Sequence, residues 1–403
     1  MRIVLINQFF YPDEAATSQF LTDVAVDLRD RGHCVEVICG RASYHPGAGD
    51  GLPGVTIHRV GSSHARSDGM PGRLAGYLTF LGGAVRRLAA LPPADTIVTL
   101  STPPMLGFLG VAAKRWGHDR FLFWVQDIYP EIAERLGVLR WKPLNLFFQS
   151  VMADVYAAAD TVVVLGEDMK QKLSDFYPVT CKTEVVHHWP LSEAAHEIDR
   201  ELERKRLGWG RDFVLLYSGN LGRAHDLATF LEGFRIFSAR NSGARLVIAG
   251  EGYRRAEVEV FARRHPELRI DRMGHQPREG LAGFLASADV HLVSQRPEAD
   301  GLVVPSKLYG ILESARPLTF VGSAFNEVAS LLGKYQFGVR VDPGDAPGLA
   351  AAWELLRREP STSAQMGKNA RQLARGVFSR RAGLCRLASL IKGAWNVDQI
   401  PIE

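Results

Sequence analysis

The segment YSGNLGRAHD, residues 217–226, places small residues where an apolar run meets a helix-like stretch. Gly219, Asn220 and Gly222 leave room for an anion beside backbone N–H groups, and a helix start adds a favourable dipole. The guanidinium group of Arg223 can bind a phosphate through two parallel hydrogen bonds. The segment therefore predicts a phosphate-binding turn, with a plain strand-to-helix turn as the alternative. It matches neither the P-loop pattern nor GxGxxG, so those nucleotide-binding motifs are not supported.

A second segment, RPEADGLVVPSKLYGILESARP, covers residues 296–317 and combines an acid, a turn and a helix start. Glu298 and Gly301 come before the helix, and Ser306 is a residue type that caps helices. Lys307 then falls in the first helical turn, where its charge opposes the helix dipole unless an anion lies against it. That local conflict indicates an anion site. The alternative is an ordinary surface lysine whose charged end reaches solvent.

Three other segments put small or polar residues where a strand-like run ends or a helix begins. They are Gly250 and Gly252 after residues 245–249, Gln126 and Asp127 after residues 121–125, and Thr17 and Ser18 at the first helix. Ligands of open parallel sheets bind beyond the carboxyl ends of the strands, so these positions are candidates for substrate contact. Bare turns and a helix-capping aspartate are the alternatives.

These candidate residues depend on an alternation of strands and helices that runs twice along the chain. The strand-like apolar runs are residues 3–6, 35–39, 55–60, 96–100, 121–125 and 161–165, followed by 213–217, 245–249, 290–293 and 318–321. Helical stretches separate them, and the first, residues 17–31, stops at Gly32. Continuous apolar strands separated by helices indicate parallel sheets covered on both faces. The predicted fold class is α/β, with two doubly wound, Rossmann-like domains.

The chain length supports two domains, because 403 residues and 44.5 kDa exceed what one hydrophobic core usually covers. We predict a first domain over residues 1–190, a linker over 191–210 and a second domain over 211–375. Hydrophobic residues make up 46% and charged residues 23%, as in ordinary globular proteins. The net charge of +4 arises from 48 basic and 44 acidic residues without a dense basic stripe, so no nucleic-acid partner is expected.

The sequence gives no support to metal, disulfide or membrane-spanning roles. The four cysteines show no CxxC spacing, and there is neither a DxD pattern nor a histidine cluster of metal-binding type. The N-terminal MRIVLINQFFYP is typical of a first strand rather than of a signal peptide, whose apolar region is longer. No stretch approaches the length of a membrane-spanning apolar helix. We therefore expect a cytoplasmic protein that needs no metal and no other cofactor.

Four motifs, in their order along the chain, carry a resemblance to a known family: RGHCVEVIC, WVQDIYPE, YSGNLGRAHD and VPSKLYGILESARP. Together they resemble the GT-B glycosyltransferases, and more closely family 4, the retaining enzymes that use nucleotide-sugar donors. The pairing of WVQDIYPE with PSKLYGIL is similar to the subset that builds bacterial exopolysaccharide (colanic-acid type), capsule or O-antigen repeats. The resemblance implies an acceptor-binding first domain that faces a donor-binding second domain across a cleft. It also implies a C-terminal helix, residues 376–403, that crosses back to the first domain.

The resemblance assigns the donor diphosphate to the second domain, although the residues depart from the family pattern. The family's Arg and Lys after the first donor-loop glycine fall on Asn220 and His225 here. Arg223 and Lys307 would then have to neutralise the diphosphate.

The family's pair of glutamates is also altered. Glu298 matches the first, whereas the second falls on Ser306 or on Gly310, neither of which is an acid. Glu313 lies one helical turn from Gly310 and is a candidate contact for the ribose. The histidine often found at the end of a first-domain strand in the family is replaced by Gln126.

The chemistry that the resemblance implies is stabilisation of a leaving group. A glycosyl transition state resembles an oxocarbenium ion, and negative charge grows on the departing diphosphate. Arg223, Lys307 and helix-start N–H groups suit that charge without a metal. The departing phosphate can itself take the acceptor proton. Asp127 is then expected to orient the acceptor hydroxyl rather than to act as a base, because nothing in the sequence predicts a raised pKa.

A basic, amphipathic segment suggests a contact with a membrane surface. An apolar face at helical spacing is formed by Leu74, Tyr77, Leu78, Leu81, Val85 and Leu88, with Trp116 further along the chain. The basic residues of the same region are Arg66, Arg73, Arg86, Arg87, Lys114, Arg115 and Arg120. Such a helix can lie on the anionic inner leaflet, near a lipid-linked acceptor. A packed helix with a solvated basic edge is the alternative.

The leading hypothesis is a retaining transferase that moves a sugar from a UDP- or GDP-sugar to a glycan or polyisoprenyl-diphosphate-linked acceptor. A GT-B nucleotide-sugar 2-epimerase is a second hypothesis, which requires a dense set of acid–base residues in the cleft. A catalytically silent subunit that binds sugar nucleotides is a third, which the missing second glutamate allows. Acceptor-dependent release of nucleotide diphosphate supports the first, interconversion of the donor sugar the second, and binding without turnover the third.

Overall fold

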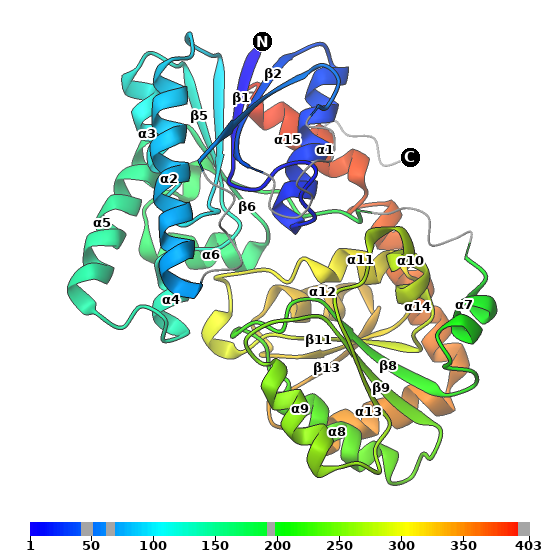
Figure 1. Ribbon diagram of the computed structural model, residues 1–403. Helices are drawn as coiled ribbons and strands as arrows, with labels where there is room; N and C mark the ends of the chain where they lie inside the picture. Colours follow the sequence, from blue (N-terminus) through cyan, green and yellow to red (C-terminus); the bar gives the residue numbers. More distant parts are fainter. Residues whose placement is uncertain (42–50, 62–68, 192–197, 394–403) are drawn as a thin grey trace. The chain divides into compact units, whose positions relative to one another are not determined.

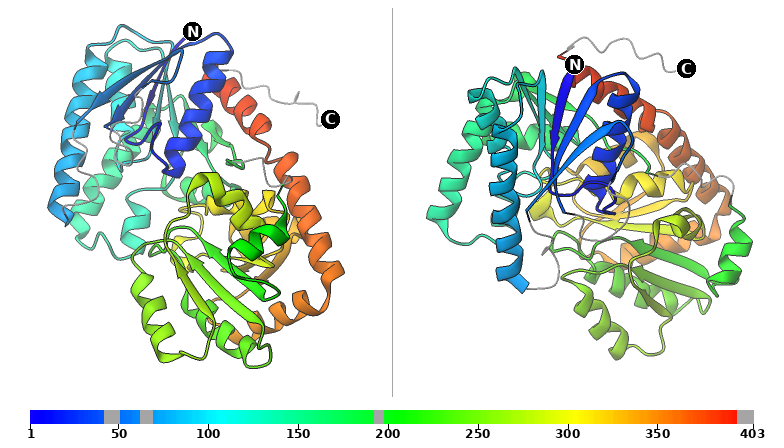
Figure 2. Two further views of the ribbon diagram at one scale, coloured as in Figure 1. Left: turned by 45° about the vertical axis from the view of Figure 1, so that its right-hand side comes forward. Right: turned by 45° about the horizontal axis from the view of Figure 1, so that its top comes forward.

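The computed structural model describes residues 1–41, 51–61, 69–191 and 198–393 (Figure 1 and Figure 2). Its contacts divide the chain into two compact units. The first comprises Met1–His187, Gly301–Val304 and Arg381–Glu403, and the second comprises His188–Asp300 and Pro305–Arg380. Each unit is a parallel sheet covered by helices, so the fold class predicted from the sequence is confirmed.

Seven parallel strands form the sheet of the first unit, in the order β3-β2-β1-β4-β5-β6-β7. They are β1 (Arg2–Ile6), β2 (Cys34–Gly40), β3 (Val55–Val60), β4 (Thr96–Leu100), β5 (Arg120–Trp124), β6 (Thr161–Val164) and β7 (Thr183–Val185). The central strands β1, β4 and β5 are buried almost throughout, which explains their continuous apolar sequences. Because the strands are parallel, the loops after β1, β4 and β5 meet at one edge.

Helices cover both faces of this first sheet, as Figure 1 shows. They are α1 (Ala16–Asp30), α2 (Gly69–Ala89), α3 (Phe108–Arg115), α4 (Glu131–Arg135), α5 (Lys142–Ala158), α6 (Glu167–Phe176) and α15 (Arg380–Ile391), with the short turn η1 (Thr180–Lys182). Helix α1 ends as predicted, because Gly32 has a φ of +81° and the His33 N–H donates to the Leu28 carbonyl at 3.1 Å. Side chains such as Phe80 of α2 and Leu109 of α3 pack with β1 and β4 into one apolar core.

The C-terminal helix α15 contacts the first sheet. The Thr96 hydroxyl of β4 donates to the Ile391 carbonyl at 3.0 Å. Arg386 pairs with Glu184 at 2.6 Å and donates to the Val185 carbonyl of β7 at 3.1 Å. Residues 381–393 thus belong to the unit that begins at Met1, whereas residues 394–403 of the predicted C-terminal helix lie outside the described residues.

Six parallel strands form the sheet of the second unit, in the order β10-β9-β8-β11-β12-β13. They are β8 (Phe213–Ser218), β9 (Ala244–Ala249), β10 (Ile270–Met273), β11 (Val290–Ser294), β12 (Leu318–Val321) and β13 (Gly338–Val341). Alternate residues of β8 enter different cores: Leu215 and Tyr217 pack among side chains of α8 and α13, whereas Val214 and Leu216 pack near Phe284 of α10. Both faces of this sheet are therefore apolar and covered.

The helices of the second unit are α7 (Arg200–Arg206), α8 (Ala228–Ser238), α9 (Arg255–Arg264), α10 (Arg278–Ala286), α11 (Lys307–Glu313), α12 (Glu327–Tyr335), α13 (Ala346–Arg358) and α14 (Pro360–Arg375), with the turn η3 (Pro297–Ala299). Across both units, no helix in the described part of the chain is long and apolar enough to cross a membrane.

Residues 191–210, predicted to be a linker, contain α7, which is anchored in the second unit. Asp199 caps the helix by accepting hydrogen bonds from two N–H groups of its first turn, at 3.0 and 3.1 Å. Arg204 is only 7% exposed and donates to the Ser287 carbonyl at 2.7 Å. The charged composition that favoured a linker thus includes a buried arginine that fixes α7 to its own unit.

Candidate functional site

The carboxyl edge of the second sheet brings together the loops after β8 and β9. The Gly219 N–H donates to the Ala249 carbonyl at 2.9 Å. Gly250 has a φ of +140°, and a Cβ atom there would clash with the Gly219 carbonyl oxygen. A Cβ atom on Gly252 would lie 2.6 Å from Oδ1 of the exposed Asn220. Packing between the loops therefore accounts for Gly250 and Gly252, and it fixes the position of Gly219.

Lys307, the first residue of α11, reaches the same edge. Its Nζ lies 3.7 Å from the centroid of the Tyr217 ring, and a Cβ atom on Gly219 would lie 3.2 Å from its Cε. The ammonium nitrogen is buried and has no hydrogen-bond partner among the described residues. Burial lowers the pKa of Lys307 well below its ordinary value. An amino group buried over an aromatic ring, with no hydrogen-bond partner in the described part of the chain, is electrostatically prepared for an anion.

His225 belongs to this edge as a neutral group rather than as a second cation. Its Nδ1 lies 2.6 Å from the Ser294 carbonyl, and a carbonyl only accepts, so Nδ1 carries the hydrogen. Burial, and then the charge of Lys307, lowers the pKa of His225 to about 3. The imidazole is therefore neutral at pH 7, and its Nε2 can accept a hydrogen bond from a hydroxyl group. Below, Gly219, Gly250, Gly252, His225 and Lys307 are together called the lysine edge.

Arg223 lies at the exposed rim of the lysine edge. Its guanidinium carbon lies 3.4 Å from the ring centroid of Tyr253, whose side chain is 65% exposed. A guanidinium group that stacks on a ring keeps the N–H groups at its edge available, which suits phosphate binding. Sequence reasoning missed both Tyr253 and Tyr217, although Tyr217 opens the motif that contains Arg223 and so offered a signal. It also missed Arg254, whose charge adds to the lowering of the His225 pKa after burial and Lys307.

Glu298 lies in η3, which is hydrogen-bonded to the loop after β8. The Arg296 N–H donates to the Ala224 carbonyl at 2.7 Å, and the Arg296 side chain pairs with Glu298 at 2.9 Å. The Glu298 Oε2 atom is buried and has no hydrogen-bond partner within the described ranges. Glu298 is therefore tied through Arg296 to the loop that carries Gly222 and Arg223.

Three predicted donor contacts do not join the lysine edge. Gly301 has a φ of +68° and packs on α6, where a Cβ atom would lie 2.8 Å from the Lys172 Cβ. Ser306 is exposed, and its side chain makes no capping hydrogen bond. Glu313 is 4% exposed, and Arg375 of α14 lies 3.9 Å from it. Glu313 comes six positions after the first residue of α11, so it points away from the side of Lys307.

In the first unit, Gln126 and Asp127 follow β5 and form what we call the aspartate edge. The Ser101 hydroxyl oxygen accepts hydrogen bonds from both of their N–H groups, at 2.8 and 3.1 Å. Asp127 also forms an antiparallel bridge with Val303. Burial raises the pKa of Asp127 to about 6. The preference for an orienting role assumed an ordinary pKa; a carboxylate whose pKa is raised can also act as a base, so the role of Asp127 stays a prediction.

Thr17 and Ser18 lie in the first turn of α1. Ser18 is fully buried, and its hydroxyl has no hydrogen-bond partner among the residues that the structure describes. Thr17 is half-buried, and no side chain caps this helix. The assignment of Thr17, Ser18 and Gln126 to acceptor binding stays a prediction.

Within the described ranges, no group of three or more His, Cys, Asp or Glu side chains is arranged to hold a metal ion. The lysine edge instead gathers positive charge from Lys307 and, at its rim, from Arg223. Whether the reaction proceeds without a metal stays a prediction.

Comparison with known proteins assigns both units. Residues 16–189 match the model of the glycosyl transferase 4-like domain, and residues 199–373 match that of the glycosyl transferases group 1. A relative from Pseudomonas aeruginosa, named "Probable glycosyltransferase WbjE", is 23% identical over 259 residues, which make up 63% of this chain and 64% of that protein. The chain thus spans less than two thirds of the length of the first curated relatives that it matches.

Solved structures share the fold along their whole length. WaaG, a glycosyltransferase involved in lipopolysaccharide biosynthesis, gives a TM-score of 0.71 at 16% identity and covers 97% of this chain and 100% of its own. HepE of Anabaena, in complex with UDP and glucose, gives a TM-score of 0.70 at 14% identity and covers 98% of this chain and 100% of its own. The fold and the two matched models define the class, which is that of the GT-B glycosyltransferases. Within this class, the chain belongs to family 4.

Proposed function

We propose that the protein is a retaining glycosyltransferase that moves a sugar from a nucleotide-diphosphate sugar to a glycan acceptor in cell-surface polysaccharide biosynthesis. The observation that carries the proposal is the buried ammonium group of Lys307, which faces the Tyr217 ring beside Gly219 and has no hydrogen-bond partner among the described residues. A donor diphosphate at this position supplies the missing negative charge. Family membership and the role of WaaG in lipopolysaccharide biosynthesis support the same activity and product class.

The proposed donor is a UDP-sugar, with a GDP-sugar as the alternative. HepE has been solved with UDP and with UDP-glucose, which favours uridine. Lys307 and Arg223 neutralise the diphosphate, and Nε2 of His225 accepts a hydrogen bond from a sugar hydroxyl. Negative charge grows on the departing diphosphate during transfer. An ammonium group with little competing solvent stabilises that charge more strongly than an exposed one.

Asp127 is proposed to take the proton of the acceptor hydroxyl as the new glycosidic bond forms. With a pKa raised to about 6, the carboxylate is mostly ionised at pH 7 and is a stronger base than an exposed aspartate. The departing phosphate is the alternative proton acceptor. The two proposals differ in pH dependence, because only the first requires an ionised Asp127.

Most of the apolar face of α2 that was predicted to contact a membrane packs inside the first unit. Phe80 and Leu88 of α2 are buried in the core with β1 and β4, and Leu81 and Val85 pack against that core. The alternative of a packed helix therefore describes Leu81, Val85 and Leu88, whereas Leu78 of the predicted face is 57% exposed. Arg66, which was grouped with it, lies outside the described residues.

We place the membrane contact at the start of α5 instead. Four apolar side chains there are between 60% and 65% exposed: Val138, Trp141, Leu146 and Phe147. Three exposed basic residues flank them: Arg135, Arg140 and Lys142. Exposed apolar groups beside basic ones, with a tryptophan among them, suit the anionic inner leaflet of a membrane. This surface supports the proposal of a polyisoprenyl-diphosphate-linked acceptor.

The activity is tested in two stages with the full-length protein. A thermal-shift screen against UDP, GDP, ADP and dTDP, with and without EDTA, identifies the nucleotide, because a ligand that binds the native state raises the midpoint. The matching nucleotide sugars are then incubated with a polyisoprenyl-diphosphate-linked saccharide, and release of nucleotide diphosphate is measured. Transfer predicts release only with acceptor, and nuclear magnetic resonance of the product then shows a retained anomeric configuration.

The other hypotheses give different results in the same assay. Interconversion of the donor sugar without acceptor would support an epimerase. A strong thermal shift without turnover on any acceptor would support a silent subunit.

The membrane surface is tested by cosedimentation with phosphatidylglycerol vesicles. Trp141→Ser with Phe147→Ser is expected to reduce vesicle binding at least about tenfold, because two large apolar side chains lose their burial. The matched control is Leu78→Ser with Trp116→Ser, which changes two other exposed apolar residues, 57% and 42% exposed. If the control loses binding and the α5 variant keeps it, the contact lies on the originally predicted surface.

A further inference from the structure

A cavity of about 720 Å³ opens at the opposite end of the second sheet from the lysine edge. Its walls are the start of α7, the end of α10, the turn before β12 and one face of α14. Ala286 precedes β11 and Arg316 precedes β12, so the cavity lies at the amino ends of these strands. The lysine edge lies at the carboxyl ends of parallel strands, which makes the two sites separate.

The cavity is lined by cationic side chains. They are Arg200, Arg316, Lys368, Arg371 and Arg375, and no described residue that lines it is acidic. Lys368, Arg371 and Arg375 follow one another at intervals of three and four residues, so they share one face of α14. Charges from α7, from the turn before β12 and from α14 therefore converge on one space.

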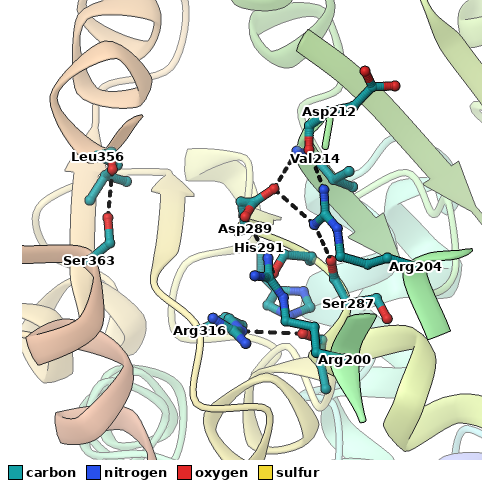
Figure 3. Close-up of polar contacts among 12 residues, drawn as sticks. Arg200, Arg204, Asp212, Val214, Ser287, Asp289, His291, Arg316, Leu356 and Ser363 are labelled. Carbon is teal, nitrogen blue, oxygen red and sulfur yellow. Dashed lines mark hydrogen bonds and ion pairs between the residues drawn. The ribbon is translucent and has the colours of Figure 1, made fainter. Parts of the chain in front are cut away.

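On one side of the cavity, an acid neutralises part of this charge, as Figure 3 shows. Asp289 accepts from Arg200 at 2.5 Å and from Arg204 at 3.1 Å. Within the described ranges, Arg316 donates only to a backbone carbonyl, that of Ala286, at 3.2 Å. One carboxylate thus serves two arginines, and the guanidinium group of Arg316 has no carboxylate partner among the described residues.

On the α14 side, the charge is less compensated. Arg375 lies 3.9 Å from Glu313, a distance beyond that of a hydrogen bond. Lys368 is exposed and makes no ion pair within the described ranges. The Nε atom of Arg371 is buried and has no hydrogen-bond partner there either. Lys368 and Arg371 therefore add positive charge that the described part of the protein does not balance.

The arginines affect one another electrostatically. Burial is the main cause that lowers the pKa of Arg316 to about 10, and the positive charges of Arg200, Arg204 and Arg371 lower it further. Asp289 opposes this effect without cancelling it. An anion between these side chains would relieve the repulsion.

The backbone is built to bring α14 against the turn that carries Arg316. Ala315 in this turn has a φ of +54°, which is rare for a residue with a side chain. A Cβ atom on Gly367 of α14 would clash with the Ala315 carbonyl oxygen. Glycine at position 367 thus permits the close approach that places Lys368 and Arg371 beside Arg316.

We propose that this cavity binds a compact anion that carries two or more phosphate groups. Guanidinium groups bind phosphate oxygens through paired hydrogen bonds, and a diphosphate can contact Arg316, Lys368 and Arg371 together. The same chemistry occurs in soluble diphosphates and in the headgroup of a lipid diphosphate. The inference is independent of the proposed function, because it uses neither the lysine edge nor the aspartate edge.

Isothermal titration with inorganic pyrophosphate tests the site in full-length protein that carries Lys307→Ala, which is expected to weaken binding at the lysine edge. This protein is expected to bind one pyrophosphate. Adding Lys368→Gln and Arg371→Gln is expected to weaken that binding at least about tenfold, because two charge-assisted contacts are lost. The matched control adds Arg240→Gln and Arg263→Gln, which remove two exposed charges elsewhere on the same unit and should leave binding unchanged.

Two results would overturn the proposal: no pyrophosphate binding to the Lys307→Ala protein, or equal binding after the two α14 substitutions. Thermal midpoints of all variants establish that each is folded. If the double α14 substitution unfolds the protein, Lys368→Gln alone changes an exposed side chain and is expected to weaken binding about threefold. Unchanged affinity in that variant would also reject the site.

Vesicles distinguish the two sources of the phosphate groups. Neutral phosphatidylcholine vesicles are compared with the same vesicles containing a polyisoprenyl diphosphate. The site is assigned to a lipid headgroup if the protein binds more strongly to the vesicles that contain the polyisoprenyl diphosphate and if Lys368→Gln with Arg371→Gln removes this additional binding. Pyrophosphate binding without a vesicle difference assigns it to a soluble diphosphate, and binding of neither probe rejects the site.

Discussion

The two units each present a buried titratable group at the carboxyl edge of a parallel sheet, and burial acts on these groups in opposite directions. It raises the pKa of Asp127 to about 6 and lowers the pKa of Lys307 well below its ordinary value. In both cases the neutral form gains, because a charge loses hydration when it is buried. The surroundings differ. The backbone N–H of Asp127 is held by a hydrogen bond to the Ser101 hydroxyl oxygen, whereas the side chain of Lys307 faces the Tyr217 ring.

This difference indicates what each edge gains from its ligand. The lysine edge gains a counter-charge, so anion binding and protonation of Lys307 support each other. The aspartate edge gains a proton donor, because a carboxylate of raised pKa accepts a hydrogen from a hydroxyl more readily. One edge is thus suited to a departing diphosphate and the other to an attacking hydroxyl, in agreement with the proposed function.

The largest expected effect comes from removing the charge of the lysine edge. Lys307→Ala should reduce turnover roughly 100-fold or more and weaken binding of the donor diphosphate, because transition-state charge loses its main stabilising group. Titration calorimetry and initial rates measure the two effects. Lys334→Ala is the matched control, since Lys334 also lies over an aromatic ring, at 4.9 Å from the Tyr335 centroid, but is exposed. Unchanged donor affinity in Lys307→Ala would remove this residue from the site.

The aspartate edge should respond in turnover rather than in donor affinity. Asp127→Asn is expected to reduce turnover about 100-fold, the usual contribution of a positioned base, while donor affinity stays within about twofold. Initial rates and nucleotide binding are compared with those of Asp119→Asn, which changes an exposed acid of the same unit. Equal loss of turnover and affinity would mean that Asp127 is structural.

The raised pKa of Asp127 predicts the shape of two pH profiles. Turnover should rise with pH through about 6 and then level off, because the ionised form is required; Asp127→Asn should lack this rise. Stability should change with the opposite sign. The native pKa lies above the unfolded value near 3.8, so ionisation costs native stability progressively between about pH 4 and pH 6.

Asp127→Asn removes that cost of ionisation. The variant should therefore have a higher thermal midpoint than the unchanged protein at pH 8, and the difference should disappear near pH 4. A midpoint that is lower at every pH would show that the carboxylate stabilises the fold instead.

The smallest expected effect concerns the rim of the lysine edge. Tyr253→Ala removes the ring on which Arg223 stacks, and exposed contacts of this kind contribute about 0.5–1 kcal/mol. Donor affinity should therefore fall only about two- to fivefold, as titration calorimetry can measure. Tyr335→Ala, which removes the ring beneath exposed Lys334, provides the control. If Tyr253→Ala weakens donor binding as much as Lys307→Ala does, Arg223 is the principal phosphate contact.

Most of the strands predicted from the sequence are central ones; the exception is the run 55–60, which coincides with the edge strand β3. The apolar run 290–293 lies within β11, and 213–217 lies within β8, because both strands are buried on two faces. Edge strands such as β10 and β13 escaped prediction, since most of their residues are only partly buried and their sequences mix apolar and charged types.

The part of the candidate site that the sequence predicted is the part whose residues are placed by the course of the backbone. The glycines after β8 and β9 and Lys307 at the start of α11 meet at one edge because parallel strands bring their carboxyl ends together. Glu313 was grouped with them by spacing in the sequence, yet it points to α14. A membrane contact was predicted for the apolar face of α2, with packing as the alternative; Leu81, Val85 and Leu88 pack in or against the core, whereas Leu78 is 57% exposed. Hydrophobic periodicity shows that a helix has an apolar face, but it does not show whether the protein core or a membrane covers that face.

The contact between Thr96 and Ile391 has a consequence for synthesis of the chain. These residues are 295 positions apart, and both belong to the first unit. A ribosome that has delivered the seven strands of the first sheet has not yet made the helix that contacts β4 and β7. The second unit, in contrast, is complete once Arg380 emerges. The first unit to begin synthesis is therefore the last to complete its contacts, and a nascent chain arrested before α15 should present a finished second unit beside an unfinished first one.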